Sequence, residues 1–163
     1  MSQLKLTFLL FILSLKLNAQ DNNIGSIQYD SLTDDKNFKV CKVYKNGIPQ
    51  YYEVGTSYEG GLKSIKEHFS KSFHLTTIHK NQTGYLTIRF IVNCEGQTGW
   101  YRFMETDLDF NRYTFDPALK TEVLAITKTL NKWKPGYYEY KPCDSYKFLI
   151  FKIVNGKIED ILP

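Results

Sequence analysis

The sequence predicts an α+β fold in which an antiparallel sheet carries a long helix packed on one face. Apolar residues alternate with polar ones over residues 85–93, the period of a half-buried strand. Apolar residues recur at steps of four and three over residues 119–133, the period of an amphipathic helix. Because the two stripes can cover each other, we expect residues 84–135 to nucleate the fold. The paired positions are Leu86, Ile88, Phe90 and Val92 on the strand and Leu119, Val123, Ile126, Leu130 and Trp133 on the helix.

The first twenty residues have the pattern of a secretory signal peptide. Lys5 gives a basic start, an apolar run covers residues 6–15, and Ala19 stands at the expected cleavage point. A membrane anchor is the alternative, but Lys16 interrupts a run that is shorter than the ~20 residues that a bilayer requires. We therefore predict a signal peptide over 1–20, a flexible lead-in over 21–36 and one domain over 37–163.

Two elements are expected ahead of the nucleus. Extended runs over residues 38–43 and 50–54 flank Asn46-Gly47, a dipeptide that favours a tight turn, and together they predict an N-terminal hairpin. Apolar residues at helical spacing then predict an amphipathic second helix over residues 62–73. Its outer face carries Lys63, Lys66, Glu67 and Lys71.

The remaining elements follow in chain order. Residues 98–106 form the second strand, with Tyr101 and Phe103 facing the core unless a bulge near Gly99 inverts the faces. Asp116 can cap the long helix, and Pro135 requires that helix to end near residue 133. A last long strand covers residues 146–154, and an Asn-Gly turn leads into a short return over residues 157–161.

Composition and motifs exclude several classes of function. Without Lys5 and Lys16 the 21 basic residues fall to 19 against 17 acidic ones, and a net charge of +2 gives no reason to expect nucleic acid or an anionic membrane as partner. No nucleophile, zinc or phosphate-binding motif is present, so we expect no catalytic residues and no cofactor. The segment from Asp107 to Asn111 begins like a calcium loop but lacks its Gly and Glu, so no metal site is expected.

Three cysteines allow one disulfide in an oxidising compartment and leave one thiol over. If the strands over residues 85–93 and 146–154 are antiparallel neighbours, Cys94 and Cys143 approach each other. We therefore predict a Cys94–Cys143 disulfide with Cys41 left over, against the alternative of three free thiols.

Several segments resemble the C-terminal domain of the TonB family. GYLTIRFIVNCEG at 84–96 is similar to the family's opening strand and acidic-Gly turn, and DPAL at 116–119 with WKPG at 133–136 resembles the beginning and end of its helix. FLIFKI at 148–153 is similar to the closing strand, and YEGG at 58–61 resembles a Pro-Gly-Gly variant before the second helix. The resemblance covers about half of the chain, residues 84–154, and implies a three-stranded antiparallel sheet with the helix on one face.

In the family this domain binds a short peptide of an outer-membrane receptor, which adds a strand to the edge of the sheet. This chain departs from the energy-coupling members, because its N-terminal segment lacks their anchor histidine and no Pro-rich spacer follows. We therefore expect a periplasmic or secreted, non-catalytic binding protein and not a transport transducer. The implied partner is an envelope protein or peptide such as an outer-membrane receptor, and exchange of edge strands implies a homodimer as one assembly.

Two candidate contact regions follow. The strand over residues 146–154 would capture a peptide if its edge is open, whereas the return over 157–161 would cover that edge if it folds back. The alternative function is a secreted inhibitor or interaction protein that docks through the loop over residues 136–142. The candidate contacts are Tyr146, Phe148, Ile150 and Lys152 on the strand and Tyr137, Tyr138 and Tyr140 in the loop.

Overall fold

A computed structural model describes residues 26–42, 47–74 and 80–163 of the chain. The predicted signal peptide, the first part of the lead-in and Asn46 of the predicted turn lie outside the described residues. The described chain is a mixed α/β fold built on an antiparallel sheet, as the sequence predicts. Among the helices of the described residues, none is both long and apolar enough to span a bilayer.

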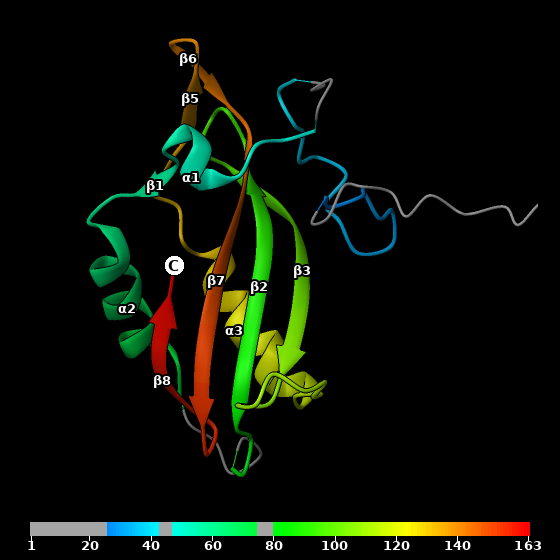
Figure 1. The fold of residues 1–163 in the computed structure, drawn as a ribbon, viewed down its shortest axis with the longest axis vertical. Coiled ribbons are helices and arrows are strands. Elements are labelled where there is room, and N and C mark those ends of the chain that lie inside the picture. The colour runs from blue at the N-terminus through cyan, green and yellow to red at the C-terminus, as the bar shows by residue number, and fades with distance from the viewer. Residues whose placement is uncertain (1–25, 43–46, 75–79) are drawn as a thin grey trace, which may run out of the picture.

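The main sheet has four strands in the order β3-β2-β7-β8. These are β2 (Gly84–Val92), β3 (Thr98–Thr106), β7 (Ser145–Val154) and β8 (Lys157–Leu162). All three neighbouring pairs are antiparallel. The predicted strands are thus present within one residue of their expected bounds, and β2 and β7 occupy the centre of the sheet (Figure 1).

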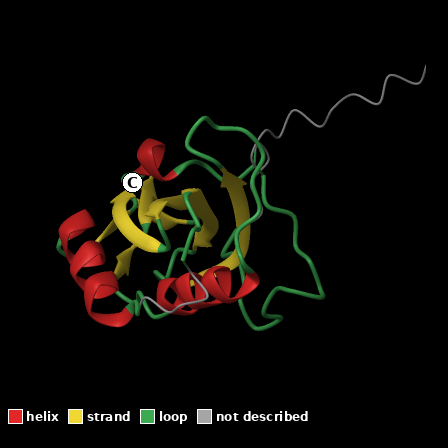
Figure 2. Cartoon of the chain, turned by 90° about the horizontal axis from the view of Figure 1, so that it is seen from below, coloured by secondary structure: helices red, strands yellow, loops and turns green. Residues whose placement is uncertain are grey.

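Two helices cover one face of this sheet. Helix α2 (Gly61–Ser72) and helix α3 (Pro117–Lys128) lie on the same side of the strands, as Figure 2 shows from below. The core between these helices and the sheet contains the apolar side chains predicted for the strand and the long helix, together with residues of α2, β7 and β8. Side chains 1 % exposed or less in this core include Leu86, Ile88, Phe90, Val92, Leu119, Val123, Leu130, Leu149, Phe151 and Ile153.

Helix α3 begins as predicted but is shorter than expected. The carboxylate of Asp116 accepts a hydrogen bond from the N–H of Ala118, and Pro117 occupies the first helical position, where its missing N–H is harmless. The helix spans 12 residues and ends at Lys128, five positions before Trp133. After the helix, residues 129–132 form a loop and Trp133–Lys134 form a short strand. Leu130 and Trp133 of this segment still pack in the core.

The predicted N-terminal hairpin is wrong. Its second strand is instead one helical turn, α1 (Tyr51–Val54), in which Glu53 accepts a hydrogen bond from the N–H of Gln50 at 2.6 Å. The described part of its first strand, residues 38–42, has no strand partner. Local capping by Glu53 thus outweighs the extended preference of the neighbouring tyrosines.

Two short ladders join the connecting segments. Strand β1 (Ser57–Tyr58) pairs with β4 (Trp133–Lys134), so the chain before α2 is tied to the chain after α3. Strand β5 (Gly136–Tyr138) pairs with β6 (Lys141–Cys143) to form a hairpin that projects beyond the sheet at the top of Figure 1.

The N-terminal segment covers one end of the second face of the sheet. Residues 26–42 contribute Ile27 and Phe38, which pack on Ile91 and Tyr146. Arg102 of β3 holds this segment through hydrogen bonds to Asp34 at 2.7 and 2.8 Å and to the carbonyl of Gln28. The segment therefore shields part of β3, which is one of the two edge strands of the sheet.

The second strand has the predicted faces and also the bulge. Tyr101 and Phe103 pack against the main core, whereas Met104 is 62 % exposed. The register with β2 shifts between Arg89 and Ile91, opposite Trp100, whose φ angle of 53° is unusual for a residue with a side chain.

Candidate functional site

Strand β7 is not an edge of the sheet. It pairs with β2 along its whole length, and β8 pairs with residues Ile150 to Val154 on its other side. The reason is the turn at Asn155 and Gly156, which have φ angles of 50° and 76° and fold β8 back onto β7. Of the two alternatives left open for this edge, the covered one is therefore correct over residues 150–154, where β8 pairs with β7.

The four residues proposed for that edge occupy the second face of the sheet. The hydroxyl of Tyr146 accepts a hydrogen bond from the N–H of Ile27, and Tyr146 is buried beneath the N-terminal segment. Phe148 and Ile150 are half-buried, and Lys152 forms an ion pair with Glu159 of β8. Tyr146 and Lys152 are thus engaged by other described residues of the chain.

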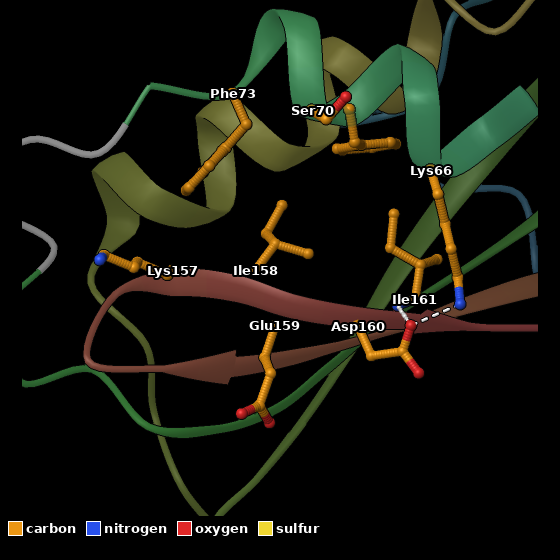
Figure 3. Close-up of a pocket in the computed structure, with 9 residues that line it drawn as sticks. Lys66, Ser70, Phe73, Lys157, Ile158, Glu159, Asp160 and Ile161 are labelled. Atoms are coloured by element: carbon orange, nitrogen blue, oxygen red, sulfur yellow. Dashed lines mark hydrogen bonds and ion pairs between the residues drawn. The ribbon is translucent and has the colours of Figure 1, made fainter. Parts of the chain in front are cut away.

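A groove lies instead between helix α2 and strand β8. Its cavity volume is about 390 Å³, and its walls come only from these two elements and Phe73, which follows α2. Figure 3 shows Ile158 and Ile161 rising from β8 toward α2, whereas Glu159 points to the opposite side. The lining is apolar at Phe69, Phe73, Ile158 and Ile161 and polar at Lys66, Ser70, Lys157, Glu159 and Asp160.

The outer side of β8 is free of backbone partners within the described part of the chain, since β8 is the terminal strand and no other segment bonds to it. The N–H of Ile161 is instead donated to the carboxylate of Asp160 at 2.8 Å. That carboxylate also lies 2.5 Å from Nζ of Lys66, so one ion pair joins the two walls of the groove. Both contacts to Asp160 lower the pKa of its carboxyl, led by the hydrogen bond from Lys66.

The three tyrosines proposed as loop contacts lie on the hairpin β5–β6. Tyr137, Tyr138 and Tyr140 are 61, 59 and 100 % exposed. Glu139 and Tyr140 have φ angles of 48° and 64°, so the turn has left-handed backbone at both central positions. The predicted loop is thus an ordered hairpin that presents aromatic side chains to solvent.

The disulfide joins Cys41 to Cys94 and not Cys94 to Cys143. Strands β2 and β7 are antiparallel neighbours, as the predicted disulfide required, but their pairing ends where Val92 meets Ser145. Cys94 then enters a turn, and Cys143 pairs with Gly136 in the hairpin. The N-terminal segment brings Cys41 to within 6.0 Å of Cys94, measured between Cα atoms.

Asp144 fixes the backbone around this disulfide. It is fully buried, and its carboxylate accepts hydrogen bonds from the backbone N–H groups of Cys41, Lys42 and Cys94. The two bridged sulfurs and this carboxylate lie within 4.8 Å of one another, but disulfide sulfurs are not thiolate ligands and the carboxylate is occupied by amides. The cluster is therefore best explained as structural. Burial raises the pKa of the neighbouring Cys143 thiol, and the charge of Asp144 raises it further.

The segment that begins like a calcium loop is a turn organised by its own side chain. The carboxylate of Asp107 accepts hydrogen bonds from the N–H groups of Asp109 and Asn111. These bonds lower the pKa of Asp107, with the Asn111 amide as the largest cause. The carboxylate thus serves as a local cap.

Sequence reasoning missed the inward-facing lysine of β7. Lys147 lies on the core face beside Phe90, is 6 % exposed, and has its ammonium 3.4 Å from the ring centroid of Tyr51. Burial lowers the pKa of Lys147 from 10.5 to about 8. The signal was present, because residues 147, 149, 151 and 153 share one face and only the first of them is charged.

Comparison of the chain with known protein families, with curated proteins and with solved structures found no match.

Proposed function

We propose that the chain is a non-catalytic binding module that captures an extended peptide by strand addition at the outer edge of β8. The observation that carries this proposal is the outer edge of β8, which has no backbone partner among residues 26–42, 47–74 and 80–163, beside the groove that β8 forms with α2. An edge strand offers unpaired N–H and C=O groups, and a neighbouring groove can take up alternate side chains of the added strand.

The two edges of the sheet differ in a way that favours β8. Arg102 of β3 is engaged by Asp34 and Gln28 of the N-terminal segment. The outer side of β8 faces a groove whose two walls are joined by the contact between Lys66 and Asp160. An added strand would take the N–H of Ile161 from Asp160, and exchange of one hydrogen bond for another has a small net cost.

The groove chemistry defines the peptide. Phe69, Phe73, Ile158 and Ile161 favour an apolar side chain at one or two alternate positions. Lys66 and Lys157 supply positive charge at the rim, and Asp160 supplies negative charge. Glu159 points away from the groove and pairs with Lys152. We therefore infer an extended peptide with alternating apolar residues and mixed or low charge.

The setting we propose is the cell envelope, with a TonB C-terminal-like arrangement of sheet and helix. Supporting features are the motifs WKPG at 133–136 and GYLTIRFIVNCEG at 84–96, a helix on one face of the sheet, and a disulfide compatible with an oxidising compartment. An outer-membrane receptor is the corresponding partner, and pairing of two β8 edges is the corresponding route to a homodimer.

Docking through the hairpin β5–β6 is the second candidate function, that of a secreted inhibitor or interaction protein. It is favoured by the full exposure of Tyr140 and the partial exposure of Tyr137 and Tyr138. Tyrosines supply large contact areas at a small loss of side-chain entropy. The two candidates use separate surfaces, so single substitutions distinguish them.

The test is selection of displayed random dodecapeptides on residues 21–163, followed by calorimetry with the selected peptides. Ser70→Trp should weaken binding at least tenfold, because Ser70 lines the groove and an indole there would occupy it. Lys63→Trp is the matched control on the same helix, since the Lys63 side chain is 88 % exposed and lies outside the groove.

Loss of binding in Tyr140→Ala with normal binding in Ser70→Trp would instead establish hairpin docking. Both candidate functions would be wrong if no peptide is selected above background, or if neither Ser70→Trp nor Tyr140→Ala changes the affinity for the selected peptides.

A further inference from the structure

One backbone amide at the outer edge of β8 is already occupied by the side chain that precedes it. The N–H of Ile161 donates to Oδ1 of Asp160 at 2.8 Å. Ile161 lies opposite Phe151 in the antiparallel ladder, but an amide carries one hydrogen, and here the carboxylate takes it. Edge amides are the groups that an added strand binds. The carboxylate of Asp160 therefore stands where the carbonyl oxygen of an incoming strand would stand.

Helix α2 holds the Asp160 carboxylate in this position. Nζ of Lys66 lies 2.5 Å from the same oxygen, Oδ1, so one atom receives both contacts (Figure 3). These contacts lower the pKa of the Asp160 carboxyl, with the hydrogen bond from Lys66 as the largest cause and the amide of Ile161 as the next. The acceptor is thus a charged carboxylate at neutral pH, and a charged acceptor binds an amide more strongly than a neutral carbonyl does.

The neighbouring acidic residue on the same strand is arranged differently. Glu159 points away from α2 and pairs with Lys152 of β7 (Figure 3). It is the extra residue of a bulge, where the register of β8 on β7 shifts. Bulges and charged side chains are common means by which edge strands resist pairing with other chains. Both features occur here, and Asp160 is the acidic side chain that reaches the amide of Ile161.

We propose that Asp160 is an autoinhibitory cap of the β8 edge, which an incoming strand has to displace from the amide of Ile161. This inference rests on the function proposed for β8 and adds what limits the affinity of that edge. Displacement replaces a charge-assisted hydrogen bond by a weaker one to a neutral carbonyl. The contact with Lys66 adds little to the cost, because the two side chains are 42 and 41 % exposed and exposed ion pairs are weak.

A cap predicts that removal of the side chain strengthens binding. Asp160→Ala should raise the affinity for the selected peptides roughly threefold to tenfold, from the difference between a charged and a neutral acceptor. Asp160→Asn keeps an uncharged acceptor and should give a smaller gain. Glu159→Ala is the matched control, since it removes the same charge from the adjacent position of β8, and it should leave the affinity unchanged. Calorimetry with the selected peptides measures these differences.

A second measurement needs no peptide. Hydrogen exchange followed by NMR gives the protection of the Ile161 amide, corrected for the intrinsic exchange rate of each sequence. This protection should fall at least threefold in Asp160→Ala and stay unchanged in Glu159→Ala. The two measurements together distinguish a cap from a residue that contacts the peptide, because truncation of a contact residue weakens binding.

Higher affinity of Asp160→Ala together with loss of protection at Ile161 supports the cap. If wild type binds peptides that Ser70→Trp weakens, but Asp160→Ala binds them equally or less well, the cap is wrong and the function proposed for β8 stands. Unchanged protection of Ile161 in Asp160→Ala would overturn the cap as well. If no peptide binds at the groove of either protein, strand addition and the cap are both wrong.

Discussion

At the scale of single residues, Lys147 makes stability depend on pH. Its pKa is about 8 in the folded chain and near the ordinary 10.5 when unfolded. Between these values the unfolded chain binds more protons than the folded chain, so the free energy of unfolding rises with pH. The rise is at most about 3 kcal/mol, at about 1.4 kcal/mol per pKa unit. Urea unfolding from pH 7.5 to 10.5 measures it.

The comparison that isolates this effect is Lys147→Met, because other titrating groups are common to both proteins. The difference in stability between wild type and Lys147→Met should shift in favour of wild type as pH rises. Lys134→Met, with an exposed side chain, should follow the wild-type curve. Parallel curves for all three proteins would mean that Lys147 is not desolvated.

Single residues were also the least predictable feature of the chain. Period-two alternation assigns Lys147 to the core face, but the long apolar stem of lysine usually allows the ammonium to reach water. Asp144 is likewise unremarkable in sequence, although it accepts from three backbone N–H groups around the disulfide. Asp144 accepts from Cys94 and Cys41, which lie about 50 and 103 positions away in the sequence. A local sequence pattern therefore cannot predict these hydrogen bonds.

At the scale of elements, the disulfide ties the N-terminal segment to the turn after β2. It joins residues 53 positions apart, and a loop of this size corresponds to about 4 kcal/mol in the chain-entropy estimate. Reduction of wild type should therefore lower the free energy of unfolding by about 2–4 kcal/mol. Urea unfolding with and without a phosphine reductant measures this difference.

Two variants identify the cysteines responsible. Cys41→Ser should be insensitive to the reductant, whereas Cys143→Ser should keep the full effect because Cys143 is free. If the reductant destabilised Cys41→Ser but had no effect on Cys143→Ser, the disulfide would instead join Cys94 to Cys143.

Elements with strong local signals were predicted well. Helix α2, strands β2, β3, β7 and β8, and the Asp116 cap of α3 lie within one or two residues of their expected positions. Helix α1 was missed because Tyr51 and Tyr52 favour a strand, and only the contact from Glu53 to Gln50 identifies the turn. Helix α3 was predicted too long because the apolar stripe continues into Leu130 and Trp133, which are buried without being helical.

At the scale of the whole molecule, strand order decides which surface is available. The sequence contains each strand and the Asn155-Gly156 turn, but local patterns do not state whether β8 covers β7 or leaves it open. Among the described residues, the order β3-β2-β7-β8 makes β8 and not β7 the terminal strand on this side and places α2 beside it. The candidate groove therefore results from tertiary arrangement, and only its separate walls could be predicted from sequence.

The same arrangement predicts the order in which backbone amides exchange with deuterium. Strand β2 is paired on both sides over most of its length, and β7 is paired on both sides over residues 150–154. These two strands also carry many buried side chains, so their doubly paired amides should exchange slowest, through global unfolding. Residues 26–42, which have no strand or helix, and the hairpin β5–β6, which projects from the sheet, should open locally and exchange fastest. Exchange followed by mass spectrometry on peptic fragments measures this order, and reduction of the disulfide should accelerate residues 26–42 further while leaving β8 unchanged. Protection of residues 26–42 equal to that of β2 would show that the N-terminal segment unfolds only with the central sheet, as an integral layer of the fold.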